Sequence, residues 1–420
     1  MPTSRHPSFG VRGSGGSGDL RQGNLTSILR YVRDHGSSSR HDIAQGCGLG
    51  ISTMTDLISE LRSRRLVKEL DPIRRPAAGR PTRPIALDGE PWCALGIHID
   101  VDNIRLSAVT VGGREVWSAS VPVDLRDSGA DAPGIIRDVL LRELVHLPPD
   151  KELLAVEVGV TGYVARNRGT VSWSARLGWH DFALIPLVNE VLAELGIRRI
   201  HVGVANDTHL AGLHAARVEL ATPPHTVAAY LGGVRGLGSG VIVAGEIYRG
   251  AHGGAGDFGH ANIDPSGPPC WCGRNGCLEA YVGLPRLLAD SGLMELREAQ
   301  QAVDADPDRA VQALADAAAA GNARVGTVLE RSAEVLGRVF DDVIGVVNPH
   351  IVILGGYLGV LSPYLLDGIR RRTEVRTKVA SFAGTEIVGL TQVVPRVVGG
   401  AALAARDACL NDPLGLTRPL

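Results

Sequence analysis

The stretch GDFGHANIDPSGPPCWCGRNGCLE, residues 256–279, brings one histidine and three cysteines close together in the chain. The cysteines follow a C-x-C-x4-C spacing, and the four side chains are those of His260, Cys270, Cys272 and Cys277. Thiolate and imidazole donors in a set of four suit tetrahedral Zn²⁺ and leave no open position for catalysis. A disulfide or three buried thiols are the plainer alternatives, but a complete ligand set favours metal. We therefore predict one structural Zn²⁺ per chain, which fixes this loop.

The runs AGDFGH and CWCGRNGCLEAY within and beside this stretch resemble the signature of the ROK family, which contains sugar kinases and the sugar-responsive repressors related to them. The resemblance implies that the zinc loop holds His260 and Glu279 against a bound sugar. It also implies a sugar contact at Asp257, where the family pattern has glutamate, which is one methylene longer. The resemblance covers essentially residues 21–405.

Length and composition indicate a soluble globular protein. A chain of 420 residues predicts about two or three domains, and 44% hydrophobic with 21% charged residues is typical of globular chains. The N-terminus has no apolar run, so we expect neither a signal peptide nor a membrane span. The cysteines outside the proposed zinc site are scattered, which is typical of reduced proteins and predicts a cytoplasmic location.

Charge is distributed unevenly along the chain. Residues 1–90 contain 14 Lys and Arg against 9 Asp and Glu, whereas the remainder contains 29 against 36. A basic N-terminal part on an acidic body predicts that only the first part contacts nucleic acid. Within it, residues 1–20 are rich in Gly and Ser and are predicted to form a disordered tail.

Residues 21–90 show the pattern of a winged helix-turn-helix. Apolar residues recur at helical spacing in two segments, around a short segment that Ser39 is expected to cap. These apolar residues are Leu25, Ile28, Leu29 and Val32 in the first segment and Met54, Leu57, Ile58 and Leu61 in the last. Ser52 is expected to cap the last helix. Two strands, Leu66–Glu69 and Ile85–Leu87, then flank a basic tip rich in Pro and Gly, which completes the wing.

This arrangement predicts binding to double-stranded DNA. The last helix would lie in the major groove, Arg80 would enter a minor groove, and the other arginines would neutralise phosphates. Three apolar helices also occur in domains that touch no DNA, and a basic loop is often merely solvated, but the combination favours DNA. The residues expected to contact DNA are Ser52, Thr53, Thr55, Arg62, Arg74, Arg75, Arg80 and Arg83. The run GRPTRPIAL, residues 79–87, also resembles the wing of ROK-type repressors.

The remaining chain is predicted to form two α/β lobes around a cleft. Short strands open both halves, and each set is followed by alternating strands and helices. We expect the first lobe at residues 91–205 and the second, with the zinc loop, at residues 206–420, the last helix being free to pack on the first lobe. The ROK resemblance implies the same arrangement, an actin/hexokinase-like pair of lobes that close on sugar and nucleotide.

A sugar-sized effector site is predicted at the cleft. Asn206 and Asp207 follow an apolar strand and match the Asn-Asp motif of ROK kinases, in which the Asp is the general base. A carboxylate and an amide also suit any sugar-binding site. The simpler alternative for Asp207 is that it caps the helix that follows. Gly162 lies in a segment that resembles the family loop whose backbone touches the sugar. The alternative is an ordinary turn at the end of a strand. The predicted effector-binding residues are Gly162, Asn206, Asp207, Asp257, His260 and Glu279; Trp179 is assigned to the core.

The positions that match the phosphate loops of ROK kinases have changed. The first loop of those kinases reads D-x-G-x-T-K, whereas here His98 replaces the leading Asp, and Asp100 and Val101 bring side chains into the glycine region. In the second loop, Arg235 replaces a threonine. Two carboxylates would repel a triphosphate, and side chains would block close approach of the backbone. We therefore predict a degenerate kinase fold without enzymatic activity.

Taken together, the sequence predicts a transcriptional regulator of carbohydrate-related genes that is controlled by a sugar or sugar-derived effector. By family resemblance we expect a repressor. Because two half-sites multiply specificity, we expect a homodimer or a dimer of dimers on its operator. Two alternatives stay open: an active ATP-dependent sugar kinase fused to a DNA-binding domain, and a ligand-independent regulator whose body is a zinc-braced scaffold. Asp257 in place of glutamate keeps the second alternative open.

Overall fold

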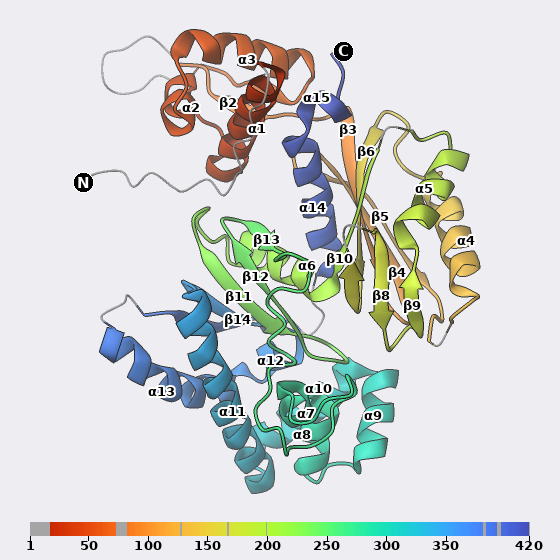
Figure 1. The fold of residues 1–420 in the computed structure, drawn as a ribbon, viewed down its shortest axis with the longest axis vertical. Helices are drawn as coiled ribbons and strands as arrows, with labels where there is room; N and C mark the ends of the chain where they lie inside the picture. The colour runs from red at the N-terminus through yellow and green to blue at the C-terminus, as the bar shows by residue number, and fades with distance from the viewer. Residues whose placement is uncertain are drawn as a thin grey trace.

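The computed structural model describes residues 17–72, 82–126, 128–165, 168–198, 200–380, 384–392 and 396–419. A small N-terminal unit is followed by two α/β lobes; in Figure 1 the first lobe lies to the right of this unit and the second lies below it. Within the described residues, no helix has the length and apolar content needed to cross a membrane.

The N-terminal unit has three helices and a two-stranded antiparallel sheet. Its apolar helix faces are buried as predicted, and Ser39 caps the second helix by accepting a hydrogen bond from the backbone N–H of Asp42 at 3.2 Å. The elements are α1 (Ser17–His35), α2 (Arg40–Cys47), α3 (Ile51–Ser63), β1 (Val67–Glu69) and β2 (Ile85–Leu87). The wing tip at residues 73–81, with Arg74, Arg75 and Arg80, lies outside the described residues.

Two expectations about this unit were wrong. The cap of α3 is Gly50, whose carbonyl accepts from Met54 N at 3.0 Å, so the helix starts before Ser52 and places that residue in its first turn. The predicted tail is also too long, because α1 begins at Ser17. An ion pair between Arg21 of α1 and Glu60 of α3 holds this first part of α1 against its neighbour. Residues 1–16 lie outside the described residues.

The first lobe is built on a five-stranded sheet in the order β10-β6-β3-β4-β5. Strands β10, β6 and β3 run parallel, whereas β3, β4 and β5 form an antiparallel meander. Helices α4 and α5 cover one face (Figure 1), and a small antiparallel sheet β7-β8-β9 adjoins the cleft. The elements are β3 (Trp92–Ile99), β4 (Asn103–Thr110), β5 (Glu115–Pro122), α4 (Ala132–Leu144), β6 (Glu152–Val160), β7 (Tyr163–Ala165), β8 (Thr170–Ser174), β9 (Trp179–Phe182), α5 (Leu184–Glu194) and β10 (His201–Asn206).

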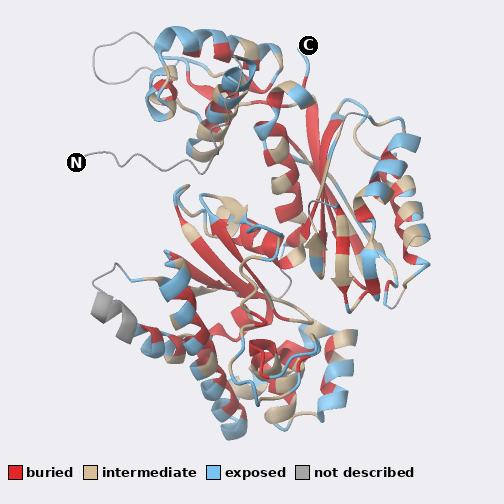
Figure 2. Ribbon diagram, viewed as in Figure 1, coloured by how far each residue is buried: buried red, intermediate tan, exposed pale blue. Residues whose placement is uncertain are grey.

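The second lobe has a five-stranded sheet in the order β13-β12-β11-β14-β15 and a helical subdomain. Its long helix α11 ends where Asn348 adopts a left-handed conformation before the buried strand β14. The central strands of both lobes are buried (red in Figure 2). The elements are α6 (Asp207–His214), η1 (Ala215–Glu219), β11 (Val227–Gly232), β12 (Gly238–Val243), β13 (Glu246–Tyr248), α7 (Leu278–Val282), α8 (Leu284–Asp290), α9 (Leu296–Ala305), α10 (Pro307–Ala319), α11 (Ala323–Val347), β14 (Ile351–Leu354), α12 (Gly356–Val360), α13 (Ser362–Ala380) and β15 (Glu386–Gly389).

Helix α14 (Val397–Asn411) returns from the second lobe to pack on the free face of the first sheet (Figure 1). A glycine makes this approach possible, because a Cβ at Gly96 of β3 would lie 2.3 Å from the backbone nitrogen of Ala402. Gly400 allows an equally close approach to α6, whose Leu210 carbonyl would lie 1.9 Å from an added Cβ. Helix α14 therefore contacts elements of both lobes.

The N-terminal unit shares a continuous apolar core with the first lobe. Leu25 and Ile28 of α1 belong to the same buried cluster as Trp92 of β3 and Cys409 of α14. The indole of Trp92 also donates to the carbonyl of Arg64 at 2.7 Å. After α14 the chain forms α15 (Pro413–Leu416), and Arg64 donates to the carbonyl of the following Thr417. The unit is thus joined to the body by packing as well as by the chain.

Candidate functional site

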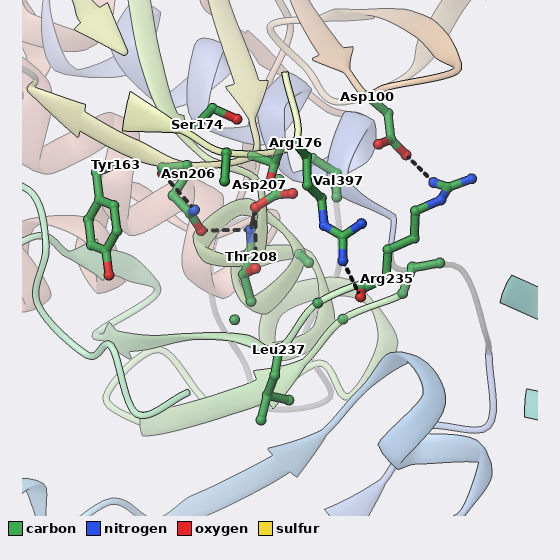
Figure 3. A pocket seen from close by; sticks show the side chains of 18 of the residues that line it. Asp100, Tyr163, Ser174, Arg176, Asn206, Asp207, Thr208, Arg235, Leu237 and Val397 are labelled. Carbon is green, nitrogen blue, oxygen red and sulfur yellow. Dashed lines mark hydrogen bonds and ion pairs between the residues drawn. The ribbon is translucent and has the colours of Figure 1, made fainter. Parts of the chain in front are cut away.

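A cavity of about 970 Å³ lies between the two lobes. The first lobe contributes the ends of β3 and β10 and the small sheet, and the second contributes the loop between β11 and β12 and the cysteine-rich loop. Figure 3 shows Asn206 and Asp207 at one wall of this cavity, which we call its floor; beside them Arg176 points to the backbone carbonyl of Arg235, whose guanidinium points to Asp100. Every predicted effector-binding residue lines the cavity, although Asn206 and Glu279 also bond to the protein itself.

Asn206 has a structural role at the start of α6. Its side-chain oxygen accepts from the backbone N–H of Thr208 at 2.9 Å and of His209 at 3.3 Å, which caps the helix. Its amide group donates to the carbonyl of Gly162 at 3.0 Å. The capping role considered for Asp207 therefore belongs to Asn206, which also positions the Gly162 loop.

Asp207 is the half-buried carboxylate at the cavity floor. Its Oδ1 accepts from the backbone N–H of Thr208 at 2.8 Å and from the Thr208 hydroxyl at 3.3 Å. Desolvation and the nearby charge of Asp100 raise the pKa of Asp207 to about 6, against the opposing effect of the Thr208 hydrogen bonds. The group is therefore largely ionised at neutral pH and can accept a hydrogen bond from a ligand hydroxyl.

Gly162 and Asp257 lie on opposite lobes at the same end of the cavity. Gly162 has a φ of +120°, and a Cβ there would lie 2.4 Å from the carbonyl oxygen of Trp173, so only glycine suits this position. Asp257 accepts a hydrogen bond from the hydroxyl of Tyr163 at 2.8 Å. The shorter carboxylate is thus partnered by the protein from across the cleft.

The four predicted zinc ligands converge. The ligand atoms of His260, Cys270, Cys272 and Cys277 all lie within 4.8 Å of one another. The Sγ of Cys270 is 3.6 Å from Nδ1 of His260, and the sulfurs of Cys272 and Cys277 are also 3.6 Å apart. Ligands bound tetrahedrally to one Zn²⁺ would be roughly 3.5–3.8 Å apart. The donor set and its spacing therefore suit a tetrahedral zinc ion.

Glu279 lies directly behind this cluster and is buried. Its Oε1 accepts from the backbone N–H of Leu237 at 3.1 Å, and its Oε2 accepts from the indole N–H of Trp271. The same Oε2 is 3.9 Å from Nε2 of His260. A carboxylate facing the second nitrogen of a metal-binding histidine orients that ring. Glu279 thus links the cysteine-rich loop to the cavity wall.

The two altered phosphate-loop positions contact each other across the cleft. Arg235, between β11 and β12, pairs with Asp100 at 3.4 Å and with Asp102 of the same β3–β4 turn. Its side chain is only 9% exposed, and Figure 3 shows it extending from the second lobe toward Asp100. Arg176 donates to the carbonyl of Arg235 and pairs with Asp304 at 3.0 Å. The residues that replace the phosphate-loop residues of the kinases therefore form one cluster of ion pairs between the lobes.

Arg176, Tyr163 and Trp271 line the cavity, although sequence reasoning did not single them out. Arg176 lies in the turn between β8 and β9, where no motif marks it. Trp271 lies inside the cysteine motif, between two of the predicted metal ligands, and this position could have marked it. On α3, Ile51 was also missed; it is 58% exposed at the first helical position, which the misassigned cap concealed.

On the N-terminal unit, the polar face of α3 is exposed. Ser52, Thr53 and Thr55 all lie on this face, near the helix start. Arg62 is also exposed but pairs with Glu69 of β1 at 3.2 Å, a carboxylate that Arg40 shares. Arg83, near the start of β2, is exposed as well. The exposed start of the helix therefore carries hydroxyls and one isoleucine.

Comparison with known proteins places this arrangement in context. The family model described as ROK family matches residues 133–404. A glucokinase from Halalkalibacterium halodurans is 28% identical over 77% of this chain and 92% of its own length. A putative xylose repressor from Caldicellulosiruptor sp. is 27% identical over 86% and 90%, respectively. The DNA-binding transcriptional dual regulator NagC of Escherichia coli is 22% identical over 94% and 95%.

Solved structures show the same fold. A ROK family transcriptional regulator, described as a homologue of the Escherichia coli MLC protein, matches with a TM-score of 0.73 at 20% identity, over 94% of this chain and 98% of that one. A ROK family glucokinase from Streptomyces griseus, in complex with glucose and AMPPNP, matches with a TM-score of 0.56 at 24% identity, over 75% and 99%. The predicted fold, a winged helix-turn-helix followed by a two-lobed ROK body, is confirmed.

Proposed function

Because this chain belongs to the ROK family, we propose that it is a DNA-binding transcriptional regulator, most simply a repressor, of carbohydrate-related genes. A sugar or sugar-derived effector binds in the inter-lobe cavity and changes the affinity of the winged helix for its operator. The observation that carries the proposal is the shared apolar core, which joins an exposed recognition helix to a sugar-kinase-like body.

The coverage of the relatives supports the DNA-binding part. The relatives named as repressors or regulators align over 86% and 94% of the chain, whereas the glucokinase aligns over 77%. The additional aligned part of the chain is comparable in length to the N-terminal unit. In this proposal α3 enters the major groove, where the Ser52, Thr53 and Thr55 side chains meet base edges or phosphates and Arg62 and Arg83 meet phosphates.

The cavity supports sensing rather than phosphoryl transfer. Asp207 and Gly162 remain on the side where a sugar would bind, but the Arg235–Asp100–Asp102 cluster occupies the side of the phosphate loops. A triphosphate would have to break this cluster and bring its charge beside two carboxylates. Zn²⁺ in the His260 cluster would hold the cysteine-rich loop, and with it Glu279, against the cavity.

A direct physical connection supports coupling of the two sites. Helix α6 starts at Asp207 on the cavity floor and continues through η1, a π-helical turn of the kind often found at functional sites, to Arg217. Arg217 pairs with Asp407 of α14. The same carboxylate pairs with Arg33 of α1 at 3.2 Å. An effector that prefers one arrangement of the lobes would thereby shift the position of α1.

DNA binding is tested by selection from fragmented genomic DNA with the full-length protein, followed by mobility shifts on the recovered sites with and without a sugar panel. We expect a recurring half-site sequence and a sugar-dependent change in affinity. Thr53→Ala, on the exposed face of α3, should weaken specific binding about tenfold. Ser63→Ala, at the far end of the same helix, is the matched control. Equal recovery of all fragments would contradict the proposal.

The glucokinase relative favours one second candidate, an ATP-dependent sugar kinase with a fused DNA-binding domain. A coupled assay with ATP and a panel of hexoses separates the two. Steady ATP turnover that is abolished by Asp207→Asn would establish the kinase, because phosphoryl transfer needs a general base whereas a protein that only binds sugar does not. We expect no turnover.

A further inference from the structure

Two of the five tryptophans in this chain line the inter-lobe cavity, and they are placed unlike the core tryptophans. Trp92 and Trp179 are each 1% exposed within the cores, whereas Trp271 is 51% exposed. Tyr163, on the neighbouring part of the lining, is 38% exposed. Large aromatic surface left open inside a polar cavity is unusual unless a ligand covers it.

These rings are held in place although they are open to the cavity. The Trp271 ring stacks on Trp173 of β8 with centroids 5.1 Å apart and planes at 28°, and its indole N–H is bonded to Glu279. Its backbone lies between Cys270 and Cys272, two of the four converging ligands. Tyr163 also stacks on Trp173, with ring centroids 6.2 Å apart, and Figure 3 shows it beside Asn206. The aromatic surface is therefore preorganised.

The cavity also has more room than one sugar ring requires. Its volume of about 970 Å³ is near the top of the range for pockets that enclose drug-sized ligands. The Arg235 cluster occupies one part of the cavity, and the lining also includes the aromatic side chains of Tyr163, Trp173 and Trp271, so part of the remaining space lies beside these rings. The hydroxyls of a first ring find hydrogen-bonding partners at Asp207, but Trp271 offers a flat apolar surface, which suits the C–H face of a second ring.

We propose that Trp271, supported by Trp173 and Tyr163, forms a second subsite, and that the effector is a two-ring glycoside. The first ring lies at Asp207 and Glu279, and the second lies on the open surface of Trp271. This inference rests on the proposed function of the cavity as a sugar-sensing site, and it names the class of sugar.

Affinity measurements with matched pairs of sugars test the inference. Glucose is compared with cellobiose and maltose, xylose with xylobiose, and N-acetylglucosamine with chitobiose, by calorimetry and by tryptophan fluorescence of the zinc-loaded full-length protein. We expect one disaccharide to bind at least about tenfold more tightly than its monosaccharide unit. Equal affinities would overturn the inference and leave the sensing function intact. If none of these monosaccharides and disaccharides binds, the sensing function fails as well.

Variants of Trp271 separate stacking from the hydrogen bond to Glu279. Trp271→Ala should remove the preference for the disaccharide and retain binding of the monosaccharide, whereas Trp271→Phe should keep most of the preference. If Trp271→Phe loses as much as Trp271→Ala, the ring is not a subsite. Zinc content and the unfolding midpoint establish that each variant is folded. Trp117→Ala on β5, away from the cavity, is the matched control and should bind as the wild type.

Discussion

Arg33 of the winged helix and Asp407 of α14 form a nearly buried ion pair at 3.2 Å, with side chains that are 4% and 11% exposed. Arg217 of η1 shares the same carboxylate, and Arg406 lies 3.6 Å away. Burial alone would raise the pKa of Asp407, but Arg217, Arg33 and Arg406 hold it below its ordinary value. The carboxylate therefore stays charged where the N-terminal unit, the first lobe and the helix from the cavity floor meet.

Asp407→Asn should uncouple the two sites and destabilise the protein. It would leave Arg33 and Arg217 without their shared counter-charge, at a cost of about 3–5 kcal/mol in free energy of unfolding. In the folded fraction, the effect of sugar on DNA affinity should shrink, whereas DNA affinity without sugar changes less. Urea unfolding and mobility shifts measure the two effects.

The control for this variant is Arg21→Gln, because Arg21 also lies on α1 but pairs with Glu60 inside the N-terminal unit. It should leave the sugar response unchanged. An undiminished response in Asp407→Asn would show that the signal takes another route.

Arg235→Ala should weaken the contact between the lobes without creating a kinase. It removes the guanidinium that pairs with both Asp100 and Asp102, which we expect to cost about 1–3 kcal/mol in the free energy of unfolding. ATP turnover should stay absent, because the carboxylates still repel a triphosphate. Thermal unfolding and the coupled assay measure these outcomes. Arg137→Ala removes an exposed pair with Glu194 and should change the free energy of unfolding far less, because solvent screens this pair. A similar loss in both variants would argue against a special role of the cleft cluster.

Stability should depend on pH through Asp207. Its pKa is raised to about 6 in the folded protein, so between about pH 4 and pH 6 the folded state binds more protons than the unfolded chain. Stability from this group is therefore lost as the pH rises through that window. Asp207→Asn removes the effect, and its stability relative to the wild type should increase by up to about 2 kcal/mol from pH 4 to pH 7.

Urea unfolding at several pH values tests this, with Asp138→Asn on the exposed face of α4 as the control for loss of a carboxyl group. A difference between Asp207→Asn and the wild type that stays constant with pH would refute the raised pKa. Sugar affinity should fall below pH 6 in the wild type, because the protonated carboxyl is a weaker acceptor.

The cysteine-rich loop should carry about one Zn²⁺ per chain. Cys272→Ser should lose stoichiometric zinc and on the order of 2–4 kcal/mol of stability, since metal binding and folding of the loop are linked. Metal analysis and thermal unfolding provide the readout. Cys47→Ser, which changes a half-buried cysteine of α2 outside the cluster, should retain the metal. Metal-free wild-type protein with unchanged stability would rule out a structural zinc site.

The local features of this protein were predictable from its sequence. The apolar faces of α1 and α3, the strands of the wing and the convergence of His260 with three cysteines depend on spacings of a few residues, which helical periodicity and tight turns determine. Even here the predicted cap of α3 was wrong. The residue with extended backbone before the helix is Gly50, not Ser52, and the residue types alone do not indicate which of the two adopts that conformation.

The contacts between distant segments were decided only by the tertiary structure. Arg235 meets Asp100 and Asp102 more than 130 positions away, and Arg217 meets Asp407 about 190 positions away. No periodicity relates such pairs; the packing of two separate sheets and the return of α14 to the first lobe bring them together. The sequence by itself thus determined the elements, the convergence of one histidine with three cysteines and the family, whereas the placement of the lobes decided which charges and rings face one another.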